Sequence, residues 1–595
     1  MTPIREALRV LGVERLALGV HDACFPCDPD EDLGRGTPYG HRAHELLRFA
    51  AELGFDTLQL GPQGETSACD PSPYDGSAFA RSTLAIPVAR LVEVGLLSEE
   101  TRRRLTGRSG DRSDHACATV AMNEVLNEAH ARASASAEHS ARRVAFIADH
   151  AHWLLADAMW EALLVEHEGR DFLEWSDPHD RGGYAWPSDA ALARRARVEE
   201  RGRPVIERWT TAQMLAHAAH AELRARARTV GLSLFADLQI GWSRRDLWAH
   251  QRTFLPDYRM GAPPSRTNPD GQPWGYPVLD PAQDAAVARL LDARFEKIAR
   301  EYDGVRIDHP HGLVCPWVYR VDDPDPFHAV RTGARLHEAA GLVDHPELDR
   351  FAIARPEQID RSRVRWDDAW VRELDDEQVD RYAVHVDLLI RRVRSARAIA
   401  CEVLSTMPYP LGRVLARHRL GRFRVTQKAA LDDPRDVYRS ENAQPADWIM
   451  VGNHDTAPIW SVAKRWVDEG RGGAHARYLA ERLLPSEADR AAFAERLAND
   501  PSALARAKLA ELFASPARNV YVWWSDLFGE TDWYNRPGLV DDRNWTLRIP
   551  RDFRRVHAER SAAGLALDVG RAVATALRAR GLREDLARAL HPDGV

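Results

Sequence analysis

The chain has no apolar run long enough to cross a membrane. A transmembrane helix needs about 18 or more consecutive apolar residues, and no window of the 595 residues approaches that length. The N-terminal apolar run is interrupted by Arg5, Glu14 and Arg15. No small-residue cleavage pattern follows, so a signal peptide is not indicated. We therefore expect a cytoplasmic protein that does not associate with membranes.

Cysteine is also scarce, since six cysteines in so long a chain do not make a disulfide framework. Cys24 and Cys27 form a CxxC motif, but no second CxxC or spaced pair of histidines accompanies it, as a zinc site would require. We interpret both as ordinary thiols rather than metal or redox groups. No metal site and no cofactor are indicated, and nothing in the sequence fits a calcium cage.

Lysine occurs at only four positions, so almost all of the positive charge is carried by arginine. The 81 basic residues do not balance the 89 acidic ones, and the net charge is −8. This excludes the basic footprint that nucleic-acid-binding proteins present. The hydrophobic fraction of 44% is typical of a globular protein.

What the sequence does contain is a repeated alternation of short apolar segments and helical segments. The first apolar run, Leu16 to Val20, is followed by helical spacing from His41 to Leu53 and by a second run from Asp56 to Leu60. This rhythm is typical of parallel βα units. The predicted strands are residues 16–20, 56–60, 232–240, 304–309, 398–403, 423–430, 448–455 and 519–524. Since eight parallel strands close a barrel, we predict an α/β fold, a TIM (β/α)₈ barrel with large helical insertions in its βα loops.

Long gaps between the predicted strands indicate insertions. Residues 89–230 are rich in Ala, Arg and Glu, so we predict a large helical insertion there, with Trp153 and Trp160 on its apolar face as core residues. A smaller, charged insertion is expected at 320–394. The catalytic barrel then covers residues 1–550, and residues 551–595 form a C-terminal helical closing segment.

The segment Gly304 to His309 ends a predicted buried strand with charged side chains. Arg306 and Asp308 are two residues apart, so both side chains point to the same face of the strand. An arginine beside a carboxylate lowers the pKa of that carboxylate and keeps it ionised, as a nucleophile requires. A structural ion pair at a strand end is an equally good interpretation of this segment taken alone.

Two further carboxylates, Glu402 and Asp455, end other predicted strands. Because Asp308, Glu402 and Asp455 lie far apart in the sequence, only a closed barrel would bring them together, at the strand ends where barrel enzymes have their catalytic groups. Two carboxyl groups on either side of a glycosidic bond are what glycoside cleavage needs. At a separation of about 5–5.5 Å one of them acts as a nucleophile and the configuration is retained.

Two loops rich in proline and glycine present aromatic side chains. In residues 70–80, Tyr74 and Phe79 lie among hydroxyls and carboxylates, which suits stacking on a sugar ring, although both also fit the role of packing anchors. A second loop covers residues 261–277, and a loop of this length is typically a functional lid. Its polar and aromatic side chains are those of Gln272, Trp274 and Tyr276.

Taken together, these segments resemble the 4-α-glucanotransferases (amylomaltases or disproportionating enzymes), which are relatives of the α-amylases. The matching blocks follow the family order between about residues 15 and 550. They are Leu60–Pro62 with Ser72–Tyr74 and Ser77–Ala80, Trp248–His250 with Gly261–Pro264 and Gln272–Gly275, Val305–His309, Glu402, His454–Asp455, and a weaker block, Tyr534–Gly538 with Asn544–Trp545. Each block alone is weak, whereas the ordered set is specific.

The resemblance implies a retaining double displacement on α-1,4-glucans such as malto-oligosaccharides. In that scheme Asp308 matches the nucleophile, Glu402 the general acid/base and Asp455 the transition-state stabiliser. Arg306 matches the arginine beside the nucleophile. The other substrate-binding positions that the resemblance implies are His309, His454, Tyr74, Gln272, Trp274 and Asn535.

Three positions depart from the family pattern. Val403 stands where the family has an Asp, so a second carboxylate is missing beside Glu402. Ser265 replaces an Asp in the lid, and Asn453 replaces a Thr before the His-Asp pair. None of these changes removes a catalytic group. They bear on acceptor binding, on preferred chain length and on the balance between transfer and hydrolysis.

We therefore predict a 4-α-glucanotransferase that moves glucan segments through a glycosyl intermediate on Asp308. The first alternative is an α-1,4-glucan hydrolase of the same fold, in which water takes the place of the acceptor. The second alternative is a glucan-binding protein with a degenerate site. The presence of all three carboxylates speaks against that second alternative.

Overall fold

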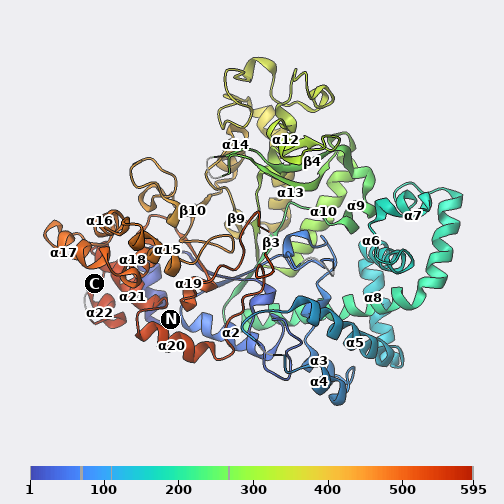
Figure 1. Ribbon diagram of the computed structural model, residues 1–595, viewed down its shortest axis with the longest axis horizontal. Helices are drawn as coiled ribbons and strands as arrows, with labels where there is room; N and C mark the ends of the chain where they lie inside the picture. The colour runs from blue at the N-terminus through green and yellow to red at the C-terminus, as the bar shows by residue number, and fades with distance from the viewer. Residues whose placement is uncertain (1, 68–70, 109, 266–267, 540, 593–595) are drawn as a thin grey trace.

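Figure 1 presents the computed structural model, which describes residues 2–67, 71–108, 110–265, 268–539 and 541–592. Asp70 of the predicted aromatic loop, Arg266 and Thr267 of the predicted lid, and residues 593–595 of the predicted closing segment lie outside the described residues.

Eight parallel strands form one sheet, in the order β10-β11-β12-β1-β2-β3-β6-β9. A parallel bridge between Cys401 and Arg422 brings β9 beside β10, so the sheet curls into a nearly closed barrel. The predicted (β/α)₈ barrel is thus confirmed. The strands are β1 (Arg15–Val20), β2 (Thr57–Leu60), β3 (Ser233–Leu238), β6 (Gly304–Ile307), β9 (Ile399–Cys401), β10 (Phe423–Val425), β11 (Trp448–Met450) and β12 (Asn519–Trp523).

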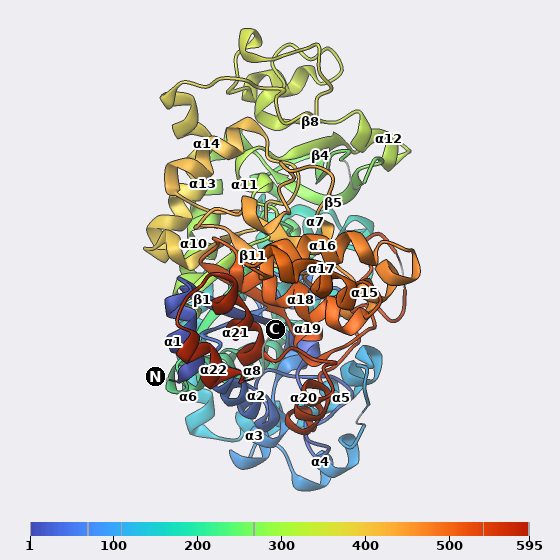
Figure 2. The same cartoon turned by 90° about the vertical axis from the view of Figure 1, so that its left-hand side faces the viewer.

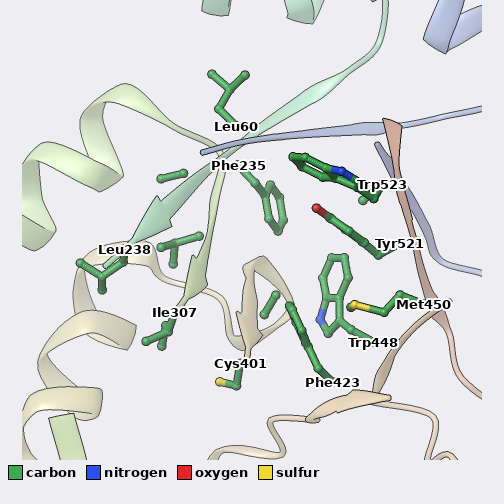
Figure 3. Close-up of a cluster of buried hydrophobic side chains, with 14 of the residues drawn as sticks. Leu60, Phe235, Leu238, Ile307, Cys401, Phe423, Trp448, Met450, Tyr521 and Trp523 are labelled. Carbon is green, nitrogen blue, oxygen red and sulfur yellow. The ribbon is translucent and has the colours of Figure 1, made fainter. Parts of the chain in front are cut away.

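Aromatic side chains fill the interior of this barrel. Figure 3 shows Phe235, Phe423, Trp448 and Tyr521 converging from four strands, and each is less than 5% exposed. Space for them depends on Gly19 of β1, because a Cβ atom there would collide with the phenol of Tyr521. Burial on both faces of the sheet explains the continuous apolar runs that the sequence shows at the strands.

Several strands end earlier than predicted. β9 stops at Cys401, β10 at Val425 and β11 at Met450. Glu402 therefore directly follows its strand, whereas Asp455 lies in a turn beyond β11. In that turn the backbone N–H of Asn453 donates to Oγ1 of Thr456 over 2.8 Å, so a local side-chain bond replaces the strand ladder.

The prediction that residues 261–277 form a loop was wrong. Part of this segment belongs to a second, antiparallel sheet with the strand order β5-β4-β7-β8. Gln272, Trp274 and Tyr276 all lie on β5 rather than on a loop. Strand β5 pairs with β4, and β4 pairs on its other side with β7, which is remote in the sequence, so a local pattern of Pro and Gly does not reveal this sheet. The strands are β4 (Phe254–Ala262), β5 (Gln272–Leu279), β7 (Trp317–Arg320) and β8 (Ala334–Arg335).

Helices occupy most of the chain between β2 and β3. Trp153 and Trp160 lie on α6, are 2% and 6% exposed, and belong to the core, as expected. In Figure 1 these helices stand on one side of the barrel and the C-terminal helices stand on the other. They are α3 (Val88–Glu93), α4 (Glu99–Leu105), α5 (His115–Ser134), α6 (Ala137–Glu166), α7 (Pro178–Gly182) and α8 (Asp189–Thr229).

Other helices cover the outside of the barrel and its loops. They are α2 (His41–Glu52), α9 (Arg244–Ala249), α10 (Asp284–Glu301), α11 (His311–Val314), α12 (Pro326–Arg331), α13 (Asp376–Val393), α14 (Tyr409–His418), α15 (Ile459–Asp468), α16 (Gly472–Leu483), α17 (Glu487–Ala498), α18 (Pro501–Ala514) and α19 (Trp524–Phe528). The predicted insertion at 320–394 contains β8, α12 and α13, together with short 3₁₀ turns.

The C-terminal segment consists of three helices, α20 (Phe553–Ala562), α21 (Val569–Ala579) and α22 (Glu584–Leu590). Gly564 and Gly581 follow the first two at φ of +73° and +62°, the left-handed conformation that ends helices. Helix α1 (Pro3–Val10) packs against α21 and α22, so the first helix of the chain lies beside its last two, as Figure 2 shows. The domain limits themselves stay a prediction.

Candidate active site

The three predicted catalytic carboxylates gather at the C-terminal end of the barrel. Asp308 directly follows β6, Glu402 directly follows β9, and Asp455 lies in the turn after β11. One carboxylate oxygen of Asp308 and one of Glu402 lie within 4.8 Å of each other. Carboxyl groups this close, rather than about 6.5–9.5 Å apart, are the arrangement in which one of them acts as a nucleophile in glycoside cleavage.

Arg306 donates hydrogen bonds to two of these carboxylates, those of Asp308 and Glu402, and to a further one, that of Asp237. Its Nη2 donates to Asp308 Oδ1 over 3.0 Å and also donates to Oε2 of Glu402. Its Nη1 donates to both carboxylate oxygens of Asp237 over 2.5 Å. The guanidinium is only 4% exposed, so one buried cation holds three carboxylates in place.

Asp237 was not predicted as a site residue, although it lies near the end of the third predicted strand. It lies directly opposite Arg306 in the register of β3 and β6, and both side chains therefore point into the barrel. Tyr74 also donates to Asp237 over 3.0 Å. The signal in the sequence was the position of Asp237 near the end of an apolar strand, where an acid is costly to bury without a partner.

The electrostatic environment shifts the pKa values of Asp308 and Glu402 in opposite directions. Burial tends to raise the pKa of Asp308, but the charges of Arg306 and His309 outweigh it and hold that pKa far below its usual range. Burial raises the pKa of Glu402 to about 7, against the opposing effect of Arg306 and helped by the charge of Asp308. At neutral pH, Asp308 is therefore an anion while Glu402 can hold a proton.

His309 and Asn453 complete the surroundings of this pair. Nδ1 of His309 lies 3.4 Å from Asp308 Oδ1 and 4.0 Å from Glu402 Oε2. Burial disfavours its protonation, but the adjacent carboxylates raise the pKa of His309 to about 9. Nδ2 of Asn453 donates to Glu402 Oε1 over 3.0 Å. Asn453 appeared in the sequence only as a departure from a family pattern, so its contact with Glu402 was missed.

Asp455 has its own pair of partners. Nδ2 of Asn535 donates to Asp455 Oδ1 over 2.6 Å, and Nε2 of His454 lies 3.3 Å from Asp455 Oδ2. Burial tends to raise the pKa of Asp455, but His454 and Asn535 lower it, so the carboxylate is ionised. The ring of Tyr74 stacks on that of His454 at 5.2 Å and 20°. Because Tyr74 also donates to Asp237, this stacking connects Asp455 and its partners with the residues around Arg306.

His21, which directly follows β1, lies beside the stacked rings of Tyr74 and His454. Its ring stacks on that of Trp545 at 6.0 Å and 10° and lies 4.9 Å from that of His454. Both ring nitrogens are buried without a hydrogen-bond partner among the described residues. Burial, reinforced by His454 and Arg306, lowers the pKa of His21, so the ring is neutral.

The β4–β5 hairpin reaches the same site. The ring of Trp274 meets that of His309 edge to face at 5.0 Å, and its Nε1 donates to Gln272 Oε1 over 3.0 Å. All ten residues predicted for the site are therefore joined by a continuous set of contacts. Of the two aromatic residues in the loop before α3, Tyr74 belongs to the site, whereas Phe79 is 3% exposed and packs in the core.

Asp308, His309 and Glu402 also form a group whose ligand-type atoms could surround a cation. Arg306 donates to both of these carboxylates, so a guanidinium already supplies the positive charge that a metal would bring. The residues present therefore suit a metal-free site. The thiols of Cys24 and Cys27 lie elsewhere, and burial raises the pKa of each to about 12.

An eight-stranded α/β barrel with carboxylates at its strand ends is the architecture of barrel enzymes that act on glycosides. Comparison with known sequences is more specific, because the 4-alpha-glucanotransferase family matches residues 29–553. The chain belongs to this family, whose members are glycosyltransferase-type enzymes.

Individual relatives are more distant. The 4-alpha-glucanotransferase of Streptococcus pneumoniae serotype 4 is 28% identical over 300 residues, which are 47% of this chain and 56% of that protein. The chain thus spans about half the length of this curated relative. Over the described residues, no helix combines the length and the apolar character that a membrane span requires.

Two solved amylomaltases share the fold at low sequence identity. The amylomaltase from Streptococcus agalactiae, in complex with acarbose, has a TM-score of 0.71 and 19% identity, over 93% of this chain and 99% of that one. The amylomaltase from Corynebacterium glutamicum has a TM-score of 0.63 and 18% identity, over 99% of this chain and 77% of that one.

Proposed function

We propose that this protein is a 4-α-glucanotransferase that moves segments of α-1,4-glucans between malto-oligosaccharides or longer glucans such as glycogen. One observation carries the proposal. A single guanidinium nitrogen of Arg306 bonds to both Asp308 and Glu402, and the pKa values of these two carboxyl groups move in opposite directions. A nucleophile and a general acid need this difference at one site.

In the first half-reaction, the protonated Glu402 donates its proton to the glycosidic oxygen as the bond from that oxygen to C1 breaks. A carboxylate oxygen of Asp308 attacks C1 from the opposite side and forms a glycosyl ester. The shortened glucan leaves with the proton that Glu402 supplied. Glu402 is then an anion, and Arg306 and Asn453 donate hydrogen bonds to its two oxygens.

In the second half-reaction, the 4-hydroxyl of an acceptor glucan loses its proton to Glu402 and attacks C1. The ester bond to Asp308 breaks, and its electron pair returns to the carboxylate. Two inversions give retention. Asp455, held ionised beside His454 and Asn535, stabilises the positive charge that develops on the sugar ring in both steps.

Transfer rather than hydrolysis requires that water be kept from the glycosyl ester until an acceptor arrives. Trp274 is suited to this role because it stands against His309, directly beside the nucleophile. The deciding experiment is a product profile from maltotriose, with and without added glucose. Transfer gives a ladder of longer and shorter oligomers, a hydrolase gives only shorter ones, and a degenerate binding protein leaves maltotriose intact.

We also infer a reducing compartment, such as the cytoplasm, for this protein. The inference rests on Cys24, Cys27, Cys117, Cys315 and Cys401, which are all free cysteines. We retain the barrel at 1–550 with its two insertions, and the closing segment at 551–595, as a proposal for the domain organisation. Limited proteolysis tests these limits, since cleavage is expected first at exposed loops between the units.

A further inference from the structure

A cavity of about 620 Å³ lies where α10, α11 and α13 meet the second sheet, and none of the three catalytic carboxylates lines it. Figures 1 and 2 show these helices beside β4. The volume is within the range of small-molecule sites, about 300–1,000 Å³. Apolar side chains that form its wall include Trp242, Met260, Val278, Leu291, Phe295 and Leu388.

Arg294 of α10 lines this cavity and is only 5% exposed. Its Nη2 donates to the backbone carbonyl of Gln239 over 2.6 Å, and its guanidinium lies 4.4 Å from the ring centroid of Trp242. Among the described residues, no carboxylate lies within ion-pair distance of it. Burial lowers the pKa of Arg294 to about 10, against the opposing charge of Asp246, so the group is still charged at neutral pH. A buried cation without a carboxylate in direct contact is costly, and an anion from solution would offset that cost.

More positive charge surrounds the opening. Arg350, Arg381 and Arg391 line the cavity, are exposed, and make no ion pair with any residue that the structure describes. Asp280 and Asp284 lie on the wall formed by the start of α10, and Asp280 already accepts a hydrogen bond from the backbone of Ala282. The arginines outnumber these acids, so the local field attracts anions.

Two histidines in the wall are held in a fixed orientation. Nδ1 of His337 lies 3.1 Å from the carbonyl oxygen of Phe351, and Nδ1 of His385 lies 3.2 Å from that of Leu313. Because a carbonyl oxygen only accepts, each ring carries its proton on Nδ1. Burial lowers the pKa of His337 to about 4 and also lowers that of His385, so both rings are neutral.

We propose that this cavity is a binding site for a small amphiphilic anion, with an apolar body against the wall and a carboxylate, sulfonate or phosphate group paired with Arg294. A neutral sugar does not fit the same surroundings, since it would not neutralise Arg294 and would meet apolar side chains over most of its surface. The site is separate from the proposed glucan groove and is independent of the proposed transfer activity.

Two fluorescent probes with nearly the same apolar body test the proposal: anilinonaphthalene sulfonate, which is an anion, and phenylnaphthylamine, which is neutral. Both are titrated into the intact protein with excess maltotriose present to occupy the glucan groove. We expect one saturable site for the sulfonate. Arg294→Met should weaken the sulfonate at least about tenfold, because a charge-assisted bond is lost, and leave the neutral probe unchanged.

Arg289→Met is the matched control, because Arg289 lies on the same helix, is exposed and does not line this cavity. It should leave both affinities unchanged. The proposal fails if the sulfonate shows no saturable site, if Arg294→Met weakens both probes equally, or if Arg289→Met has the same effect as Arg294→Met. A thermal melt of each variant confirms that it is folded.

A bulky side chain provides an independent test of location. Leu388→Trp should exclude both probes by filling the cavity, and decanoate should displace the sulfonate from the unmodified protein. If Leu388→Trp does not fold, Val384→Trp serves in its place, because Val384 lines the same cavity but is 53% exposed. Undiminished sulfonate binding to a folded filling variant would place the probe elsewhere and overturn the assignment.

Discussion

The side-chain amide of Asn453 donates to Glu402, with 3.0 Å between Nδ2 and Oε1. A hydrogen bond donated to a carboxylate favours its ionised form and lowers its pKa. The bond thus opposes the burial that raises the pKa of Glu402 to about 7.

We expect Asn453→Ala to raise the pKa of Glu402 further. Because the general acid must be protonated, the alkaline limb of the pH–activity profile should move to higher pH. The measurement is transfer from maltotriose as a function of pH. Asn123→Ala, on the exposed face of α5, is the control and should leave the profile in place. An alkaline limb that stays at the wild-type pH in Asn453→Ala would contradict this role.

Asp237→Asn should move the same limb in the opposite direction. Removal of the Asp237 charge frees Arg306 to pair more strongly with Glu402 and removes a nearby negative charge, so the pKa of Glu402 should fall. The variant should also lose about 1–3 kcal/mol of unfolding free energy, since a buried charged hydrogen bond is broken. A loss of stability without a shift of the alkaline limb would limit Asp237 to a structural role.

Asp308→Asn should lower transfer on the order of 10⁴-fold or more while the fold is retained, because an amide of nearly the same shape is a poor nucleophile. The check combines the rate with a thermal melt. Near-normal transfer in the folded variant would remove Asp308 from the mechanism.

Glu402→Gln should separate the two half-reactions. A donor with a good leaving group, such as a glycosyl fluoride, needs no general acid and should still glycosylate Asp308, after which the missing base stalls the second step. Mass spectrometry should then find a glycosylated peptide that contains Asp308. In the unmodified protein, transfer should decline as pH rises through about 7, where Glu402 loses its proton. Absence of the glycosylated peptide would show that the two roles are wrongly divided.

Trp274→Ala tests the part of β5 that faces the nucleophile. Loss of one aromatic contact costs roughly 0.5–1.5 kcal/mol beyond the lost buried area, and a change of 1.36 kcal/mol is about tenfold in rate. We expect weaker glucan binding and a larger share of free glucose formed by hydrolysis. Trp186→Ala is the control, because Trp186 is 52% exposed on the helical segment between β2 and β3. If the ratio of transfer to hydrolysis is unchanged and only the melting temperature falls, Trp274 is a packing residue.

Local patterns in the sequence were sufficient to predict the barrel. Each strand is a short apolar run that is buried on both faces, so its position is visible without knowledge of its neighbours. The residues that end such runs, Asp308 and Glu402, could be named for the same reason. The strand ends were less certain, because turn bonds such as that between Asn453 and Thr456 depend on a few local atoms.

Only the tertiary structure decided which groups meet. Asp237 faces Arg306 because β3 and β6 are paired in one particular register, and Asn453 reaches Glu402 only across the closed barrel. Trp274 lies on a strand because β5 pairs with β4, and β4 pairs in turn with β7, which is distant in the sequence. Nothing in the sequence distinguishes Arg294 from the other arginines, and packing makes it a buried cation beside a cavity. The amino-acid sequence by itself determined the segments and the chemistry available at their ends. The electrostatics of the site were decided by the fold, because interactions between charges depend on distance and burial in space rather than on separation along the chain.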